Sequence, residues 1–214
     1  MNSAFIEPPR GLYLITPDEP DSDRLLASVR PLLAAGTRWL QYRNKRADSD
    51  LRWHQVERLL PLCREFAVPL IVNDDWRLAA ALGADGAHLG ADDGDLAAAR
   101  AALGPDAWLG ASCYDDLERA ERAIAAGASY VAFGAFFPSG TKPLARRADL
   151  PLLRQAAQLP VPTVAIGGIR PDNARSLIAA GADLLAVIGA VFDAPDPAAT
   201  VRDFLSCFPE TTSR

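Results

Sequence analysis

Apolar positions along the chain follow two alternating patterns. Short apolar runs, typical of strands buried on both faces, are separated by segments with apolar residues every three or four positions, typical of amphipathic helices. The predicted strands cover residues 12–15, 39–43, 70–72, 86–89, 108–112, 130–133, 163–166 and 184–188. The predicted helices cover residues 25–33, 49–66, 76–82, 96–103, 115–126, 150–159, 171–180 and 197–207. Eight strands therefore alternate with eight helices.

A weak internal repeat supports this count. Related glycine-containing segments precede the even-numbered strands at residues 35–37, 82–85, 126–128 and 180–183, whereas prolines introduce the odd-numbered strands. Eight alternating units in 214 residues predict an α/β fold, a closed (β/α)8 TIM barrel in a single domain. We expect residues 1–10 to form an N-terminal extension and residues 209–214 a C-terminal tail. The alternative is a doubly wound open sheet, but no GxGxxG follows the first strand.

Composition narrows the class of protein. The chain is 50% hydrophobic and 23% charged, with a formal net charge of −5, which argues against general binding to nucleic acid or anionic membranes. No apolar run approaches the roughly 18 residues of a membrane span. The first ten residues lack the apolar segment of a signal peptide. We therefore expect a cytoplasmic protein with small-molecule substrates and no nucleic-acid or membrane partner, and a homo-oligomer is compatible with the sequence.

The cysteines indicate neither a metal centre nor a disulfide framework. Cys63, Cys113 and Cys207 are odd in number and widely separated. Reduced thiols are the expected state in a cytoplasm.

Polar residues are concentrated after the predicted strands, where TIM barrels carry their active sites. The opposite, helix-to-strand loops are dominated by Gly, Ala and Pro. This asymmetry predicts one site at the carboxyl ends of the strands. Its candidate residues are Gln41, Arg43, Lys45, Asn73, Asp74, His88, Asp93, Ser112, Ser139, Gly140, Thr141, Lys142, Gly167, Gly168, Ile188 and Gly189.

Residues 73–75 follow a buried apolar run and contain one amide and two carboxylates. One aspartate is enough to cap the next helix, and we assign that role to Asp75. Asp74 is then free and should lie beside Asp93, which follows the neighbouring strand. Two adjacent carboxylates suit Mg²⁺, which takes further oxygen ligands from water and substrate phosphate. The alternatives are an acid/base pair or a salt bridge to Lys142.

Gln41 and Arg43 are two positions apart on one strand and therefore share a face. Lys45 continues the series beyond the strand. An amide and two cations at a barrel mouth suit a phosphate or diphosphate. The alternative is a solvated edge or an ion pair with Asp48.

Two further loops could hold anions. The segment from Gly134 to about Ala148 contains Ser139, Thr141 and Lys142 but no Walker A motif. It could close over an anion or be an ordinary loop. Gly167-Gly168 and Ile188-Gly189 fit a phosphate site of backbone N–H groups, or alternatively tight turns. We interpret His88 as a structural hydrogen-bonding residue and His54 as solvent-facing.

Taken together, the motifs resemble those of the thiamine phosphate synthase family. The matching segments occur in family order at residues 11–16, 41–45, 72–74, 88–93, 110–112, 134–142, 165–169 and 186–190. The resemblance implies a (β/α)8 transferase that couples hydroxymethylpyrimidine diphosphate to thiazole phosphate and releases pyrophosphate. It also implies a dissociative reaction assisted by Mg²⁺.

The resemblance further implies roles for individual residues. Gln41, Arg43, Lys45 and Asn73 would hold the pyrimidine diphosphate, and Asp74 and Asp93 would hold Mg²⁺. Arg43, Ser112 and Lys142 would be catalytic, with Ser112 and Lys142 contacting the diphosphate. The thiazole phosphate would be held by Ser139, Gly140, Thr141, Gly168, Ile188 and Gly189.

The chain departs from the family pattern at three places. Ala91 replaces the usual Gln, and Ser139-Gly140 replaces a threonine-rich start of the loop. Gly189 replaces the usual Ser, which removes a hydroxyl bond worth about 1 kcal/mol. These departures bear on thiazole phosphate binding more than on the diphosphate.

Three other functions fit the same fold. A thiazole tautomerase-like relative would lack the full diphosphate set, and a non-catalytic phosphate-binding barrel would not need the paired carboxylates. A sugar-phosphate isomerase or epimerase would need an acid/base pair at the mouth. The combination of cations and carboxylates in this chain favours the synthase.

Overall fold

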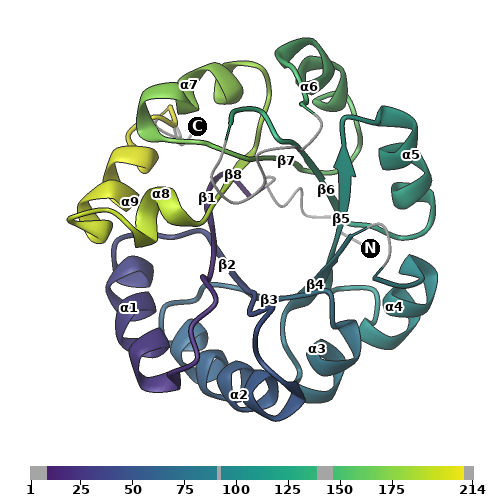
Figure 1. The fold of residues 1–214 in the computed structure, drawn as a ribbon. Coiled ribbons are helices and arrows are strands. Elements are labelled where there is room, and N and C mark those ends of the chain that lie inside the picture. Colours follow the sequence, from purple (N-terminus) through teal and green to yellow (C-terminus); the bar gives the residue numbers. More distant parts are fainter. Residues whose placement is uncertain (1–8, 91–92, 139–146, 210–214) are drawn as a thin grey trace.

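The computed structural model describes residues 9–90, 93–138 and 147–209. Its strands form a closed barrel in which each strand is parallel to its neighbours and β8 pairs with β1 (Figure 1). This confirms the predicted TIM barrel and excludes the open sheet. The strands are β1 (Gly11–Ile15), β2 (Trp39–Tyr42), β3 (Leu70–Asn73), β4 (Gly86–Leu89), β5 (Trp108–Tyr114), β6 (Tyr130–Phe133), β7 (Thr163–Ile166) and β8 (Leu184–Val187).

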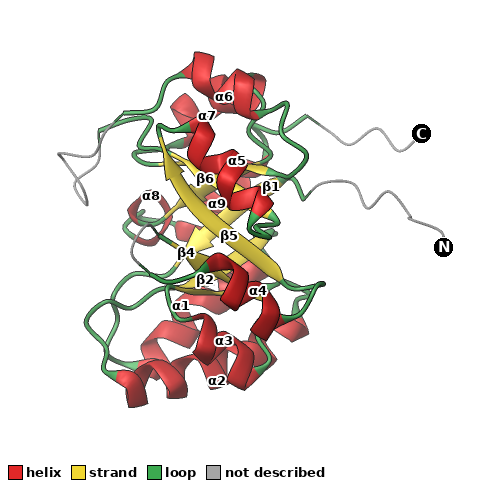
Figure 2. Cartoon of the chain, turned by 90° about the vertical axis from the view of Figure 1, so that its right-hand side faces the viewer, coloured by secondary structure: helices red, strands yellow, loops and turns green. Residues whose placement is uncertain are grey.

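Helices surround this barrel on the outside, with the strands at the centre (Figure 2). They are α1 (Ser22–Ala34), α2 (Ser49–Glu65), α3 (Trp76–Leu82), α4 (Leu96–Leu103), α5 (Leu117–Ala125), α6 (Leu150–Ala156), α7 (Pro171–Ala179), α8 (Gly189–Phe192) and α9 (Pro197–Leu205). Seven of them follow an aspartate whose carboxylate accepts a backbone N–H of the first turn. Asp75 caps α3 in this way, as predicted.

The structure differs from the predicted elements at two places near the barrel mouth. The short helix α8 directly follows β8, and four residues are too few to show a helical period in the sequence. Strand β5 continues two residues beyond the predicted end, with a register shift between Ser112 and Tyr114. Such a bulge bends a strand and changes the direction of its side chains.

The core has two parts, one between the barrel and its helices and one inside the barrel. Inside the barrel, the rings of Tyr13 and Trp39 meet edge to face at 5.3 Å. The ring of Tyr130 lies 5.0 Å from that of Trp39. Since Trp39 precedes Gln41 on β2, these rings fill the barrel below the strand ends. Polar side chains at the strand ends are therefore supported from beneath by an aromatic layer.

Two further expectations concern the whole chain. All three cysteines are free and buried. Within the described ranges, no helix combines the length and the apolar character needed to cross a membrane. The extension and the tail lie almost wholly outside the described residues.

Candidate active site

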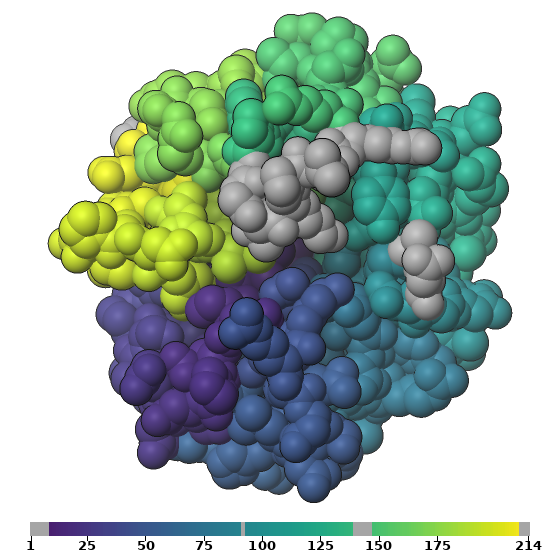
Figure 3. Space-filling view, in the orientation of Figure 1, coloured from purple at the N-terminus to yellow at the C-terminus, as the bar shows by residue number. Residues whose placement is uncertain are grey.

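A cavity of about 800 Å³ opens at the carboxyl ends of the strands. Figure 3 shows this face, where segments from the whole length of the chain meet around the barrel centre. The candidates that the structure describes all line this cavity: Gln41, Arg43, Lys45, Asn73, Asp74, His88, Asp93, Ser112, Gly167, Gly168, Ile188 and Gly189. The fold thus brings together candidates from six strand ends into one site.

Four of the predicted site residues are not placed by the structure. Ser139, Gly140, Thr141 and Lys142 lie outside the described residues, as does Ala91. Their assigned contacts with diphosphate and thiazole phosphate stay predictions.

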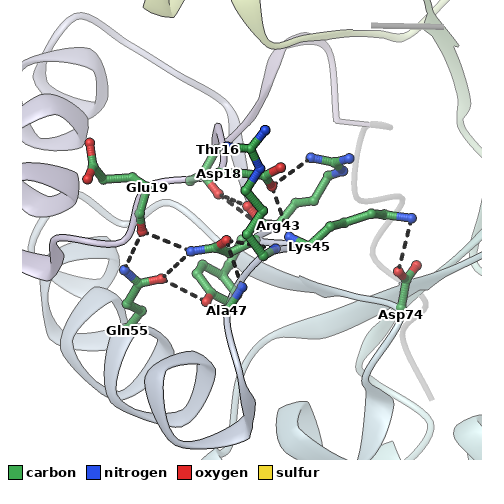
Figure 4. A network of polar contacts seen from close by, with 11 residues as sticks. Thr16, Asp18, Glu19, Arg43, Lys45, Ala47, Gln55 and Asp74 are labelled. Atoms are coloured by element: carbon green, nitrogen blue, oxygen red, sulfur yellow. Dashed lines mark hydrogen bonds and ion pairs between the residues drawn. The ribbon is translucent and has the colours of Figure 1, made fainter.

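The loop after β2 is held by the loop after β1 (Figure 4). One Asp18 carboxylate oxygen lies 3.0 Å from Nη1 of Arg43 and accepts the backbone N–H of Lys45 at 2.9 Å. The Thr16 hydroxyl donates to the Arg43 carbonyl and accepts the Arg43 N–H, both at 2.8 Å. Asp18 therefore holds the Arg43 side chain and the backbone of Lys45. Asp48, the alternative partner, instead caps α2.

Buried amides complete the support of this loop (Figure 4). Asn44 donates to the Glu19 carbonyl at 2.8 Å, and Gln55 donates to the same carbonyl at 2.8 Å. Tyr42 donates to the Gln55 side-chain oxygen at 2.8 Å. Sequence reasoning missed Gln55, because a single polar residue within a charged helix is typical of a solvent-facing position.

The Asp74 carboxylate faces one cation and one anion. Nζ of Lys45 lies 3.6 Å from its Oδ2 (Figure 4). Partial burial, followed by the neighbouring Asp93 carboxylate, raises the pKa of Asp74, while Lys45 acts in the opposite direction. Asp93 in turn accepts the Gly90 N–H at 2.7 Å. The paired carboxylates expected from adjacent strands are thus neighbours at the cavity wall.

The backbone at Asp74 is unusual. Its φ is +64°, in the left-handed region, and its N–H donates to the His88 carbonyl of β4 at 2.8 Å. Asp and Asn tolerate this conformation better than other residues with a Cβ. The backbone turn directs Asp74 toward the cavity, whereas the next residue caps α3.

The carboxylate pair fits a divalent cation. Burial, followed by the Asp93 carboxylate, raises the pKa of Asp74, so the negative charge at this place is unfavourable unless a cation lies beside it. Among the described residues, no group of three or more His, Cys, Asp or Glu is arranged to hold a metal. Mg²⁺ needs only one or two protein carboxylates, with water and phosphate oxygens as its other ligands. Asp74 and Asp93 would hold it.

His88 is a buried hydrogen-bonding residue, as predicted. Its Nδ1 lies 3.1 Å from the Tyr130 hydroxyl, and its Nε2 lies 2.9 Å from the Ser112 hydroxyl. Burial lowers the pKa of His88 to about 4. The imidazole is therefore neutral near pH 7, with both nitrogens occupied. His54 is exposed, also as predicted.

The opposite wall of the cavity is formed by the ends of β7 and β8. Gly167 and Gly168 line it together with Ile188 and Gly189. A Cβ at Gly189 would lie 2.5 Å from an Asp193 carboxylate oxygen. This wall also includes Arg170, the residue before α7.

Sequence reasoning missed several residues of the cavity. They are Tyr13, Tyr114, Arg170 and Asp193. The alternation of Tyr13 and Ile15 with Leu12 and Leu14 is a signal for Tyr13, because inward and outward residues alternate along a barrel strand. Asp193 has no such signal, since it directly follows α8, a helix that was not predicted.

Comparisons with known proteins agree on one family. The model of the family described as thiamine monophosphate synthase matches residues 12–191. A thiamine-phosphate synthase of Methylobacillus flagellatus is 57% identical over 208 residues, covering 97% of this chain and 100% of the relative. One from Xanthomonas campestris is 56% identical over 199 residues, covering 93% of this chain and 96% of the relative.

A solved structure supports the same relationship. The thiamine phosphate pyrophosphorylase from Pyrococcus furiosus superposes with a TM-score of 0.82 at 34% identity, covering 92% of this chain and 94% of that one. The similarities in sequence and in structure both extend over nearly the full length of the chain. This chain belongs to the thiamine monophosphate synthase family.

Proposed function

We propose that this chain is a thiamine phosphate synthase that joins hydroxymethylpyrimidine diphosphate to thiazole phosphate, assisted by Mg²⁺. One observation carries the proposal. Arg43, Lys45, Asp74 and Asp93 line the same cavity, although they come from three loops. Cations for a diphosphate beside carboxylates for a divalent ion are what such a substrate requires.

The proposed reaction breaks one bond and forms another. The bond between the pyrimidine methylene carbon and the diphosphate oxygen breaks, and the electron pair leaves with the diphosphate. The nitrogen lone pair of the thiazole then forms the new carbon–nitrogen bond, giving thiamine phosphate and pyrophosphate. Arg43 and Lys45 stabilise the charge that grows on the leaving oxygens, where electrostatic stabilisation has its largest effect. Mg²⁺, held by Asp74 and Asp93, would add to this stabilisation.

The buried histidine supports this reaction over an isomerase or epimerase. Those reactions need a group that takes and returns a proton at the mouth of the barrel. His88 is bonded at both nitrogens, and burial lowers its pKa to about 4, so it is a weak base. The proposed substitution needs no strong base, because the attacking nitrogen already carries its lone pair.

A direct assay tests the proposal. The protein is incubated with both substrates and Mg²⁺, and thiamine phosphate and pyrophosphate are measured together. We expect equal amounts of the two products, and strongly reduced turnover in Asp74→Asn and Lys142→Ala. Absence of product with wild-type protein, or full turnover in Asp74→Asn, would overturn it. A product formed from thiazole phosphate alone would instead indicate a tautomerase-like activity.

A further inference from the structure

A chain of hydrogen bonds crosses the barrel interior beneath the cavity. Gln41 Nε2 donates to the Tyr13 hydroxyl at 2.8 Å, and the hydroxyls of Tyr13 and Tyr130 are 2.9 Å apart. The Tyr130 hydroxyl lies 3.1 Å from Nδ1 of His88, and Nε2 of His88 lies 2.9 Å from the Ser112 hydroxyl. We refer to these five residues as the relay. It links β2, β1, β6, β4 and β5, and its two ends are candidate substrate-binding residues.

We propose that Tyr13, Tyr130 and His88 are positioning residues that set the hydrogen-bond polarity of Gln41 and Ser112. Gln41 then presents an acceptor, and Ser112 a donor, to the bound pyrimidine diphosphate. This inference rests on the proposed function for the identity of the ligand. The polarity itself is a property of the free protein.

The polarity follows from counting protons along the relay. Tyr13 accepts the amide proton of Gln41. Either tyrosine could donate to the other, but among the described residues the Tyr130 hydroxyl is the one acceptor left for the buried Tyr13 proton, so Tyr13 donates to Tyr130. Tyr130 must then donate to Nδ1 of His88, which acts as an acceptor. A neutral imidazole has one donor and one acceptor, so its proton is on Nε2 and points to Ser112. The hydroxyl proton of Ser112 is left for the cavity.

If the hydrogen bonds of the relay ran in the opposite direction, Gln41 and Ser112 would bind this ligand less well. If the Gln41 amide were reversed, each hydrogen bond would change direction, and Ser112 would donate to His88. Ser112 could then only accept a bond from the cavity, which is unfavourable toward an anionic diphosphate. The Gln41 oxygen would likewise face inward and could no longer accept from the amino group of the pyrimidine ring.

Burial keeps the relay neutral. Tyr13, Tyr130, Gln41 and His88 are all buried. Burial raises the pKa of both tyrosines and lowers that of His88. Each hydroxyl therefore keeps its proton near pH 7, and the imidazole remains uncharged. With every member neutral, the Gln41 amide that donates to Tyr13 fixes the direction of the remaining bonds.

The hydrogen bond between Tyr130 and His88 leaves no space for a side chain at Gly110. A Cβ at Gly110 on β5 would collide with the Tyr130 hydroxyl and with His88 Nδ1. Gly110 faces the partner positions His88 and Tyr130 on the two neighbouring strands. Glycine at this position is thus required for the Tyr130–His88 bond.

The tautomer of His88 can be measured without any substrate. The chain has two histidines, so ¹⁵N NMR of the imidazoles shows two rings, and His54→Gln assigns them. We expect a fixed Nε2–H tautomer for His88 and a mixture for the exposed His54. In Tyr130→Phe, Nδ1 loses its donor and the fixed tautomer should be lost. An Nδ1–H tautomer in the wild-type protein would overturn the proposal, whether or not the protein makes thiamine phosphate.

Kinetic measurements test whether the direction of the hydrogen bonds in the relay affects substrate binding. Tyr130→Phe should raise KM for the pyrimidine diphosphate about tenfold, since a misdirected Ser112 leaves a polar group unpaired. In a Ser112→Ala background, the same change should have less than about a twofold effect, because both changes remove one interaction. Fully additive effects would show that Tyr130 has only a structural role.

A matched control and a specificity test complete the experiment. Thr37 is also buried, and its hydroxyl donates to the Leu32 carbonyl at 2.8 Å before β2 begins, at the opposite end of that strand from the cavity. Thr37→Val should leave KM unchanged. Tyr13→Phe frees the Gln41 amide to reverse, so that its N–H group and not its oxygen faces the ligand. The variant should therefore show a lower preference for the substrate, whose pyrimidine ring carries an amino group, over an analogue with an oxo group at that position. Unchanged preference would contradict the proposal, and melting curves check that each variant folds.

Discussion

The ammonium group of Lys45 lies 3.6 Å from a carboxylate oxygen of Asp74, although the two residues follow different strands. Both groups line the cavity, and both are partly exposed. Such a pair contributes little to the stability of the fold, because water screens it. Under the proposed function its effect is on the site, because the cation assigned to the substrate would lie next to the carboxylate assigned to the metal.

Replacing Lys45 by Ala should therefore affect activity more than folding. We expect a fall in kcat/KM for the pyrimidine diphosphate on the order of a hundredfold, as for the loss of one preorganised electrostatic contact. The melting temperature should change little. Arg46→Ala is the matched control, since Arg46 is exposed and is not among the residues that line the cavity. Equal activities in the two variants would contradict the role of Lys45.

Asp74 and Asp75 are adjacent in sequence but should behave differently. Asp74→Asn keeps a side chain suited to the left-handed backbone, so it should fold normally while losing Mg²⁺-dependent turnover. Asp75→Ala removes the cap of α3 and should cost about 1 kcal/mol of unfolding free energy, with kcat nearly unchanged. Titrating activity with Mg²⁺ and unfolding with urea separates the two. The assignment fails if Asp75→Ala is the inactive variant.

Asp18 directs both Arg43 and the backbone of Lys45 without being among the residues that line the cavity. Asp18→Asn weakens two charge-assisted hydrogen bonds, each of which contributes about 1.5–3 kcal/mol. We expect KM for the pyrimidine diphosphate to rise about tenfold or more. Asp23→Asn is the control, because Asp23 pairs with Arg58 on the surface, 86% exposed. If both variants bind substrate normally, Asp18 does not position the cations.

His88 should make stability depend on pH. In the unfolded chain its pKa is near 6.5, whereas burial lowers it to about 4 in the folded protein. Between these values the unfolded state binds more protons, so stability is fully present above about pH 6.5 and falls as pH decreases toward 4. The largest loss by linkage is about 3 kcal/mol.

Urea unfolding from pH 4 to 7 measures this contribution. His88→Gln should show a smaller loss of stability over this range than the wild-type protein. His54→Gln should retain the full loss, because His54 is exposed. Identical profiles for His88→Gln and the wild type would disprove the contribution of His88.

Gly189→Ser tests the departure from the family pattern at the wall formed by β8. The added hydroxyl should improve affinity for thiazole phosphate about fivefold, equivalent to about 1 kcal/mol. A Cβ here meets only the carboxylate end of the flexible Asp193 side chain, which can turn away. Gly189→Ala adds the Cβ without the hydroxyl and should bring no gain. Equal effects of Ser and Ala on KM for thiazole phosphate would refute a role for the hydroxyl.

Sequence alone determined the barrel and the side of it that carries the site. Both follow from local patterns: apolar runs define buried strands, and loops at one end carry the polar residues. The neighbouring positions of Asp74 and Asp93 were also predictable, because consecutive strands of a barrel pair with each other. Asp75 could be assigned to the cap because capping is local.

Only the tertiary structure decided how the site is supported. Asp18 reaches Arg43 across two loops, and the relay joins five strands, so neither interaction has a signature in any short segment. The left-handed backbone of Asp74 and the helix α8 likewise depend on contacts with neighbouring elements. Periodicity reports the burial of each residue, whereas hydrogen-bond partners distant in sequence depend on how the strands close into a barrel.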